Sequence, residues 1–102
     1  MIRLTIEDGV AEIVLDAPEK LNSLGPEGIA ELSAAYAEAS DAGVRALLLR
    51  GEGRAFCAGR DISGVDPRED DVIGYLEGLI EPLMKQMSEF PAPTFAVAHG
   101  AC

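Results

Sequence analysis

The chain has 102 residues, of which 48% are hydrophobic and 25% are charged, and its formal net charge is −10. This composition is typical of one globular domain with a modest core, and no apolar run approaches the ~18 residues that a membrane-spanning helix needs. The negative charge and the scattering of only eight Lys and Arg residues argue against nucleic acid and anionic membranes as partners. Nothing at the N-terminus resembles a secretory leader, so we expect a cytoplasmic location.

The N-terminal residues predict a β-hairpin. Apolar and polar residues alternate over residues 2–7, and a turn at Asp8-Gly9 leads into a second β-rich run at residues 10–15. The polar loop that follows, residues 16–25, is marked by Pro and Gly and has the length at which loops tend to carry function. The simpler interpretation of this loop is a surface crossover.

A βαβ unit is predicted next. A helix begins at Pro26, because proline suits the first helical position, and Gly43 predicts its end. Apolar residues three or four apart predict its buried face, namely Ile29, Leu32, Tyr36 and Ala39. Residues 44–50 are almost continuously apolar, which is typical of a fully buried strand in a parallel sheet. The order strand, helix, strand therefore predicts an α/β fold.

The last third of the chain predicts a second helix and a further strand. We expect the acidic residues 66–71 to form a solvated loop and helix start, because metal ligands there would lack EF-hand spacing and its glycine. Pro82 should kink or divide the helix, whose predicted apolar face is Ile73, Leu76, Ile80, Leu83, Met87 and Phe90. Residues 94–98 predict another buried strand, and the open sheet edge near Cys102 predicts a continuation or a partner.

The stretch around which the chain is organised is Arg-Ala-Phe-Cys-Ala-Gly-Arg-Asp-Ile-Ser, residues 54–63. Small residues after a strand and a Gly-rich turn leave backbone N–H groups accessible to an anion or a developing oxyanion, although a plain tight turn has the same composition. The segment A-L-L-L-R-G-E-G-R-A-F-C-A-G-R-D-I at residues 46–62, together with D-A-P-E-K-L-N-S-L at residues 16–24 and P-A-P-T-F-A-V-A-H-G at residues 91–100, resembles the enoyl-CoA hydratase/isomerase, or crotonase, superfamily. The three segments match in order and spacing.

The resemblance implies an α/β fold, a crotonase-like spiral of ββα turns that is truncated before its second half, with residues 1–102 as the N-terminal part of a single domain. It implies an enzyme that binds acyl-CoA thioesters and stabilises a thioester enolate with two backbone N–H groups. Such enzymes assemble as homotrimers or as hexamers made of two trimers. Coenzyme A is part of the substrate, so neither a separate cofactor nor a metal is implied.

Hydration of a 2-enoyl-CoA is the expected reaction within this superfamily. Isomerisation of an enoyl-CoA or of a ring-type acyl-CoA is one alternative, since a hydratase and an isomerase differ in the acid and base groups that they use. A non-catalytic CoA-binding or assembly fragment is another, if the chain ends at Cys102.

Residue by residue, the resemblance implies that the Ala58 N–H is the first oxyanion donor. Lys20 and Leu21 would lie in the loop that lines the CoA channel. The segment expected to surround the adenine and pantetheine, mainly through backbone contacts, is Gly59, Arg60, Asp61 and Ile62. Arg60 stands where many members have a small residue, which leaves a contact with a CoA phosphate open. The second oxyanion amide and the acid/base carboxylates would lie beyond Cys102, in the remaining C-terminal half of the same enzyme.

A thiol enzyme is the sharpest alternative, with Cys57 as the nucleophile and His99, the sole histidine, as its base. The apolar setting of Cys57 and the lack of a neighbouring cation disfavour a reactive thiolate. His99 better fits a hydrogen-bonded polar residue at a strand end. Cys57 and Cys102 support neither a disulfide framework nor a zinc site, and the sequence lacks P-loop and dinucleotide-binding glycine motifs.

Overall fold

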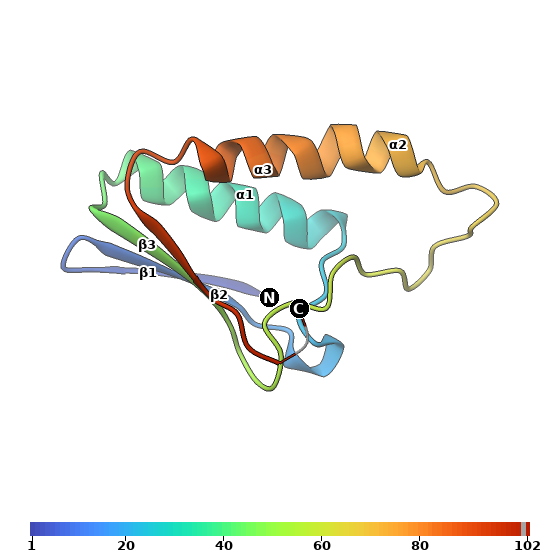
Figure 1. Cartoon of the computed structure of the whole chain (residues 1–102), viewed down its shortest axis with the longest axis horizontal. Helices are drawn as coiled ribbons and strands as arrows, with labels where there is room; N and C mark the ends of the chain where they lie inside the picture. Colours follow the sequence, from blue (N-terminus) through green and yellow to red (C-terminus); the bar gives the residue numbers. More distant parts are fainter. Residues whose placement is uncertain (101) are drawn as a thin grey trace.

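The computed structural model describes residues 1–100 and 102, which form a four-stranded mixed sheet with helices packed on one face (Figure 1). The strand order is β1-β2-β3-β4, with bounds Ile2–Glu7, Val10–Leu15, Ala46–Gly51 and Thr94–Val97. The pairing of β1 with β2 is antiparallel, and the other two pairings are parallel. The predicted hairpin and the α/β order of elements are confirmed.

Helix α1 (Pro26–Asp41) connects β2 to β3 and supplies five of the twelve buried residues of the core cluster. It ends as predicted, because Gly43 adopts a positive φ of 67° and its N–H donates to the Ser40 carbonyl over 3.0 Å. All four residues of its predicted apolar face are buried against Ala11, Ile13 and Leu15 of β2 and Leu47 and Leu49 of β3. The predicted βαβ unit is therefore confirmed, core face included.

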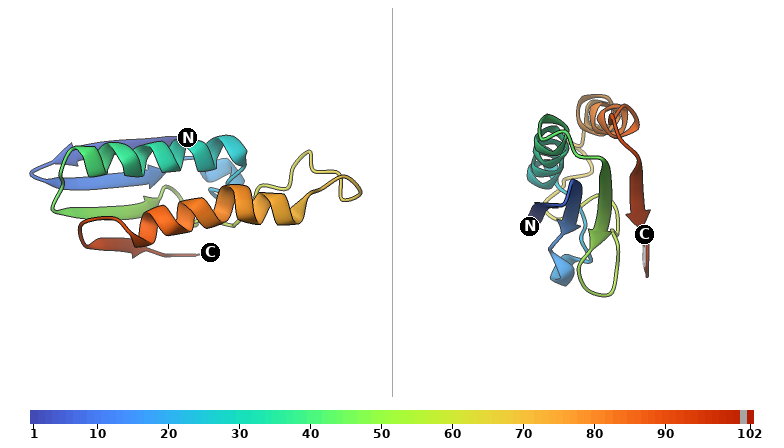
Figure 2. Two further views of the ribbon diagram at one scale, coloured as in Figure 1. Left: turned by 90° about the horizontal axis from the view of Figure 1, so that it is seen from above. Right: turned by 90° about the vertical axis from the view of Figure 1, so that its left-hand side faces the viewer.

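The prediction of two fully buried strands is wrong. In β3, Leu47 and Leu49 are buried under the helices, while Leu48 and Arg50 on the opposite face are only partly covered. Strand β4 is exposed along its whole length, with Phe95 60% exposed. The reason is that the helices lie on the same face of the sheet (Figure 2), so its other face has no cover among the described residues.

Pro82 interrupts the regular α-helical pattern of the second helix with a π-helical turn, where the sequence predicted a kink or a division. The helix comprises α2 (Val72–Tyr75), the π turn η2 (Leu76–Ile80) and α3 (Glu81–Ser88). At the end of the π turn the Glu81 N–H donates to the Leu76 carbonyl, five residues back. Pro82 has no N–H and would clash with a carbonyl four residues back, so the wider turn accommodates it without breaking the helix.

The π turn rotates the N-terminal end of this helix relative to the predicted face. An extra residue in one turn shifts the register, so the side chains before η2 no longer follow the 3.6-residue period of those after it. Ile73 is 68% exposed, whereas Tyr75 and Leu79 are the residues that pack against the core. The predicted face is correct from Ile80 onward and wrong before it.

Tyr36 is the group in the core whose ionisation should be visible in solution. Its ring is 2% exposed and meets Phe90 edge to face, with centroids 5.8 Å apart. Burial raises the pKa of the Tyr36 hydroxyl to about 12 from its ordinary 10.0, because the phenolate would lose its hydration.

We therefore expect the protein to lose stability as the pH rises from 10 toward about 12, because the unfolded chain releases the Tyr36 proton first. The loss should reach about 2 to 3 kcal/mol of unfolding free energy, which is two pKa units in energy. Tyr36→Phe keeps the ring contact and should remove this part of the alkaline slope in urea unfolding at stepped pH. An unchanged slope in the variant would contradict the assignment.

Candidate functional site

Two loops far apart in sequence lie against each other at one end of the sheet. The first, residues 16–25, contains the short helix η1 (Pro18–Lys20), and the second, residues 51–62, follows β3. Three backbone hydrogen bonds join them, from Ala58 N–H to Leu21, from Leu24 N–H to Gly59 and from Asp61 N–H to Leu24, with lengths of 2.9, 2.8 and 2.9 Å. The structure thus brings the predicted site residues of both segments together.

The side chain of Asn22 holds the two loops in this arrangement. It is 1% exposed, and all of its hydrogen bonds go to backbone groups. Its Oδ1 accepts from the Ala17 N–H over 2.8 Å, and its Nδ2 donates to the carbonyls of Glu52 and Ala55 over 2.9 and 2.8 Å. A buried amide with these partners fixes both chain segments, because leaving any of the three backbone groups unpaired would be costly.

The backbone of this junction leaves no room for a different arrangement. Leu21 and Asn22 both have positive φ angles, 53° and 58°, which asparagine tolerates better than most residues. Gly51, the last residue of β3, has no space for a side chain, since a Cβ there would lie 2.9 Å from the Asn22 Nδ2 and 2.5 Å from the Phe56 carbonyl oxygen. Sequence reasoning did not select Asn22, and its only signal was a polar residue inside an otherwise Pro- and Gly-marked loop.

The amide predicted as the oxyanion donor is engaged within the protein. The Ala58 N–H donates to the Leu21 carbonyl, so a ligand oxygen would have to share or replace that bond. The amide of Arg60 is placed differently. In the parallel bridge between Leu24 and Arg60, the bonds to Leu24 come from the Gly59 carbonyl and the Asp61 N–H. The N–H of Arg60 itself therefore points to the other side of its strand.

The Arg60 side chain is bound to the start of the second helix. Its Nη1 and Nη2 donate to the two carboxylate oxygens of Asp70 over 2.9 and 2.8 Å, and its Cζ lies 4.0 Å from the centre of the Tyr75 ring. The hydrogen bond from Arg60 is the first cause of the lowered pKa of the Asp70 carboxyl. The guanidinium is thus already paired with Asp70 and stacked on Tyr75, which argues against a role as a phosphate ligand.

Lys20 and Asp61 form a looser pair across the two loops. The Lys20 Nζ lies 3.4 Å from the Asp61 Oδ2, and the lysine side chain is half exposed. Asp61 mainly accepts from the hydroxyl and the N–H of Ser63, and these bonds, followed by Lys20, keep the pKa of the Asp61 carboxyl below its ordinary value. Ile62 is 71% exposed, next to this pair.

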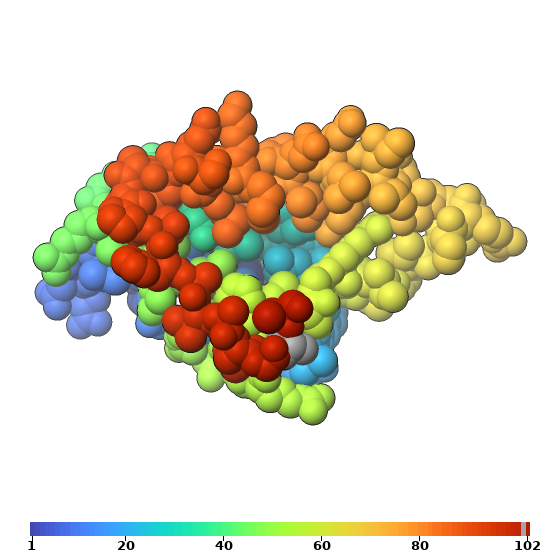
Figure 3. All heavy atoms as spheres, viewed as in Figure 1, coloured from blue at the N-terminus to red at the C-terminus, as the bar shows by residue number. Residues whose placement is uncertain are grey.

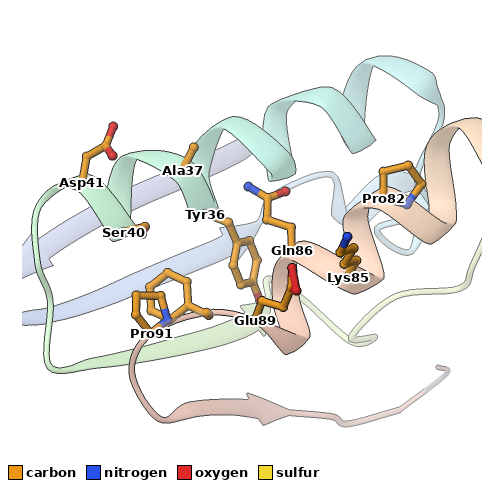
Figure 4. A pocket seen from close by; sticks show the side chains of 10 residues that line it. Tyr36, Ala37, Ser40, Asp41, Pro82, Lys85, Gln86, Glu89 and Pro91 are labelled. Atoms are coloured by element: carbon orange, nitrogen blue, oxygen red, sulfur yellow. The ribbon is translucent and has the colours of Figure 1, made fainter.

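The hollows of the surface lie partly at this junction and partly elsewhere. One of about 330 Å³ is lined by Lys20 and Asp61 together with Ser23 and the first turn of α1. A larger cleft of about 480 Å³ lies between α1 and α3, with Tyr36, Gln86 and Glu89 in its walls (Figure 4). In the space-filling view, β4 lies at the surface beside the loop junction (Figure 3). The larger cleft contains none of the predicted site residues.

The alternative chemistries find little support in the described residues. The His99 ring nitrogen Nε2 lies 2.9 Å from the Gly53 carbonyl oxygen, and Cys57 packs against the core, so the two are not a hydrogen-bonded pair. In the acidic segment, Asp66 binds Arg68, Asp70 binds Arg60 and Asp71 accepts from the Gly74 N–H. Within residues 1–100 and 102, no group of three or more His, Cys, Asp or Glu side chains could hold a metal ion. None of the helices described there is long and apolar enough to cross a bilayer.

The fold and the paired loops define a crotonase-like α/β protein, and the comparisons with known proteins agree. The sequence model of the enoyl-CoA hydratase/isomerase family matches residues 5–102. The chain belongs to the enoyl-CoA hydratase/isomerase family. The predicted family and fold class are confirmed, and the chain corresponds to the N-terminal part of its relatives.

Individual relatives show how far the likeness extends. The chain is 39% identical over 100 residues to "Probable enoyl-CoA hydratase echA6" of Mycobacterium tuberculosis, covering 98% of this chain and 39% of the relative. It is 35% identical over 100 residues to the 1,2-epoxyphenylacetyl-CoA isomerase of Escherichia coli, covering 93% and 38%. The crystal structure of a Mycobacterium abscessus protein assigned as an enoyl-CoA hydratase/isomerase matches with a TM-score of 0.89 and 30% identity, covering 100% of this chain and 42% of that one. The chain therefore spans about two fifths of the length of these relatives.

We expect Asn22→Ala to lower the unfolding free energy by about 3 kcal/mol, because it leaves three backbone groups unpaired, two in buried and one in partly buried surroundings. Asn22→Gly should recover about 1 kcal/mol of this loss by relieving the cost of the positive φ. Urea unfolding measures both, with Ser23→Ala in the same loop as the control. A loss for Asn22→Ala no larger than the control's would disprove the role of the amide.

Proposed function

We propose that this chain forms the part of an enzyme that binds a CoA thioester. The enzyme stabilises a thioester enolate in a backbone oxyanion hole, with hydration of a 2-enoyl-CoA as the reaction. The observation that carries the proposal is the pairing of the two loops in a chain of this family. It places Lys20 and Leu21 beside residues 58–61 and holds the backbone of the turn rigid through Asn22. A rigid set of backbone amides is what oxyanion stabilisation requires, since donors that need no reorganisation stabilise a transition state most.

Two amides of the turn compete for the role of oxyanion donor. The family resemblance assigns the Ala58 N–H, but that group already donates to Leu21. The Arg60 N–H points away from Leu24, and among the described residues no carbonyl accepts from it. We therefore favour Arg60 as the donor and retain Ala58 as the alternative. In this proposal Gly59, Asp61 and Ile62 contact the pantetheine and adenine around it, and the amide is worth about 3 to 4 kcal/mol of transition-state stabilisation.

The acid and base groups of the reaction are proposed to come from sequence that the relatives have in addition to the part matched here. Isomerisation is the second candidate reaction, and the observation that favours it is the similarity to a protein named as a CoA-thioester isomerase. A homotrimer or hexamer remains part of the proposal for the whole assembly. Hydration consumes the conjugated double bond of crotonyl-CoA, whereas isomerisation moves it, so absorbance and product analysis separate the two reactions.

The binding part of the proposal is tested with a CoA thioester conjugated to an electron-donating aromatic ring. Its absorption band moves to the red when the carbonyl oxygen is polarised, so the band reports an oxyanion hole without any need for turnover. We expect the purified protein to bind the probe and to shift its band, and we expect free coenzyme A to compete. Binding without a shift would indicate a CoA-binding module and contradict the oxyanion role. Absence of binding would contradict both CoA binding and the oxyanion role.

The choice between the two amides is tested by replacing single amide N–H groups with ester oxygens. The chain can be joined chemically at Cys57, so the ester is introduced at position 58, 59 or 60 in a synthetic segment that begins at residue 57. We expect the ester at Arg60 to abolish most of the red shift and the ester at Gly59 to serve as the matched control. A shift lost with the ester at Ala58, and kept with the one at Arg60, would restore the original assignment.

A further inference from the structure

The Arg60 side chain joins the loop junction to the second helix across an irregular segment. Between Arg60 and Asp70 lie nine residues with no helix or strand, held mainly by local turns such as Ser63 on Asp61 and Arg68 on Asp66. In Figure 1 this segment extends beyond the edge of the sheet. The two hydrogen bonds from Arg60 to Asp70 and its stacking on Tyr75 close the segment into a loop tied at its base.

The pair at this base is better placed than an ordinary surface ion pair. The Arg60 and Asp70 side chains are 26% and 16% exposed, and the bonds are bidentate, so the guanidinium plane has a fixed direction. The Tyr75 ring lies against that plane and also packs against the core. By contrast, the Arg68–Asp66 pair in the same segment has an arginine side chain that is 90% exposed and makes a single side-chain contact of 3.4 Å. An exposed ion pair of that kind contributes little to stability.

The fixed side chain acts on the backbone to which it is attached. Arg60 follows Gly59, whose φ of 102° gives the chain conformational freedom just before the amide in question. The bonds with Leu24 hold the Gly59 carbonyl and the Asp61 N–H on one side, and the clamp on the guanidinium holds the side chain of the residue between them. Because the Gly59 carbonyl and the Arg60 N–H share one planar peptide, the bond from Leu24 sets the direction of that N–H, and the clamp on the guanidinium adds a second restraint on the same residue.

We propose that Asp70 and Tyr75 are positioning residues that hold the Arg60 peptide N–H in the direction required to polarise a thioester carbonyl. This role rests on the proposed function, because it is the oxyanion donor that is being positioned. It deepens that function by assigning the Arg60 guanidinium to the protein's own helix and not to a phosphate of the ligand. The contacts of Arg60 with Asp70 and Tyr75 also connect the N-terminal end of the second helix to the turn that contains Arg60.

The test compares the red shift of the conjugated thioester at saturation in the purified protein and its variants. Asp70→Asn removes the negative charge that pairs with Arg60, and Tyr75→Leu removes the ring on which the guanidinium stacks. Arg60→Lys keeps the positive charge and the peptide N–H but loses the two parallel hydrogen bonds of the guanidinium. We expect all three to lose most of the shift while the dissociation constant changes little, because an amide misplaced by about 1 Å loses most of its effect. Asp70→Glu keeps a carboxylate and should restore part of the shift.

The matched control is Asp66→Asn, which makes the same charge change in the same segment and should leave the shift unchanged. Because the shift is read at saturation, a variant that is merely less stable keeps the full shift in its folded fraction. A full shift in Asp70→Asn with normal binding in the wild type overturns the positioning role alone. Absence of thioester binding in the wild type overturns the proposed function and this role with it.

The same variants separate positioning from direct recognition of a CoA phosphate. If Arg60 bound a phosphate, Arg60→Lys would weaken binding of the CoA thioester, leave binding of the matching pantetheine thioester unchanged, and keep the red shift with both. We expect equal loss of the shift with both thioesters, since neither the clamp nor the peptide N–H involves the nucleotide end. The phosphate pattern would overturn the proposal.

Discussion

The structure of the loop junction depends on one buried amide. Asn22 is excluded from water, and its three hydrogen bonds all go to backbone groups, for which no other backbone partner is found among residues 1–100 and 102. In a low-dielectric interior each of these bonds is strong, and its loss would be expensive, so the junction has one arrangement and not several. The three backbone hydrogen bonds between the two loops, which involve Leu21, Leu24 and residues 58–61, form in this arrangement. Asn22 therefore fixes how the two loops meet, although its side chain need not touch a ligand.

Pro82 also influences the geometry of this turn, through the second helix. The proline forces a π turn into the second helix, the extra residue rotates the first turn of that helix, and Tyr75 rather than Leu76 then packs inward. The inward-facing Tyr75 ring stacks on the Arg60 guanidinium, and Asp70 just before the helix completes the clamp. A residue that breaks the regular pattern of the helix thus contributes to the geometry of a loop on a different part of the chain.

Local patterns in the sequence predicted the hairpin, α1 and its buried face, and the interruption of the helix at Pro82, because each depends on near neighbours. They failed where a feature depends on what covers it. The apolar runs of β3 and β4 suggested burial on both faces, but β3 is buried on one face only and β4 is exposed along its whole length. The family resemblance selected the turn that contains Ala58. It could not show that the Ala58 N–H is bonded to Leu21, since that bond depends on how two distant loops pair. Asn22 and Tyr75 were missed because their roles come from long-range contacts.

Lys20 and Arg60, two of the cations at the loop junction, differ in what they can offer an anionic ligand. Arg60 makes two short bonds and a stacking contact, all of which would have to be given up before it could turn to a phosphate. Lys20 has one contact of 3.4 Å and is half exposed, and a pair of this kind contributes at most about 1 kcal/mol. Moreover, Asp61 keeps its bonds to Ser63 when the lysine leaves. Of Lys20 and Arg60, Lys20 is thus the one that an anionic ligand can recruit at little cost, while Arg60 remains bound to Asp70 and stacked on Tyr75.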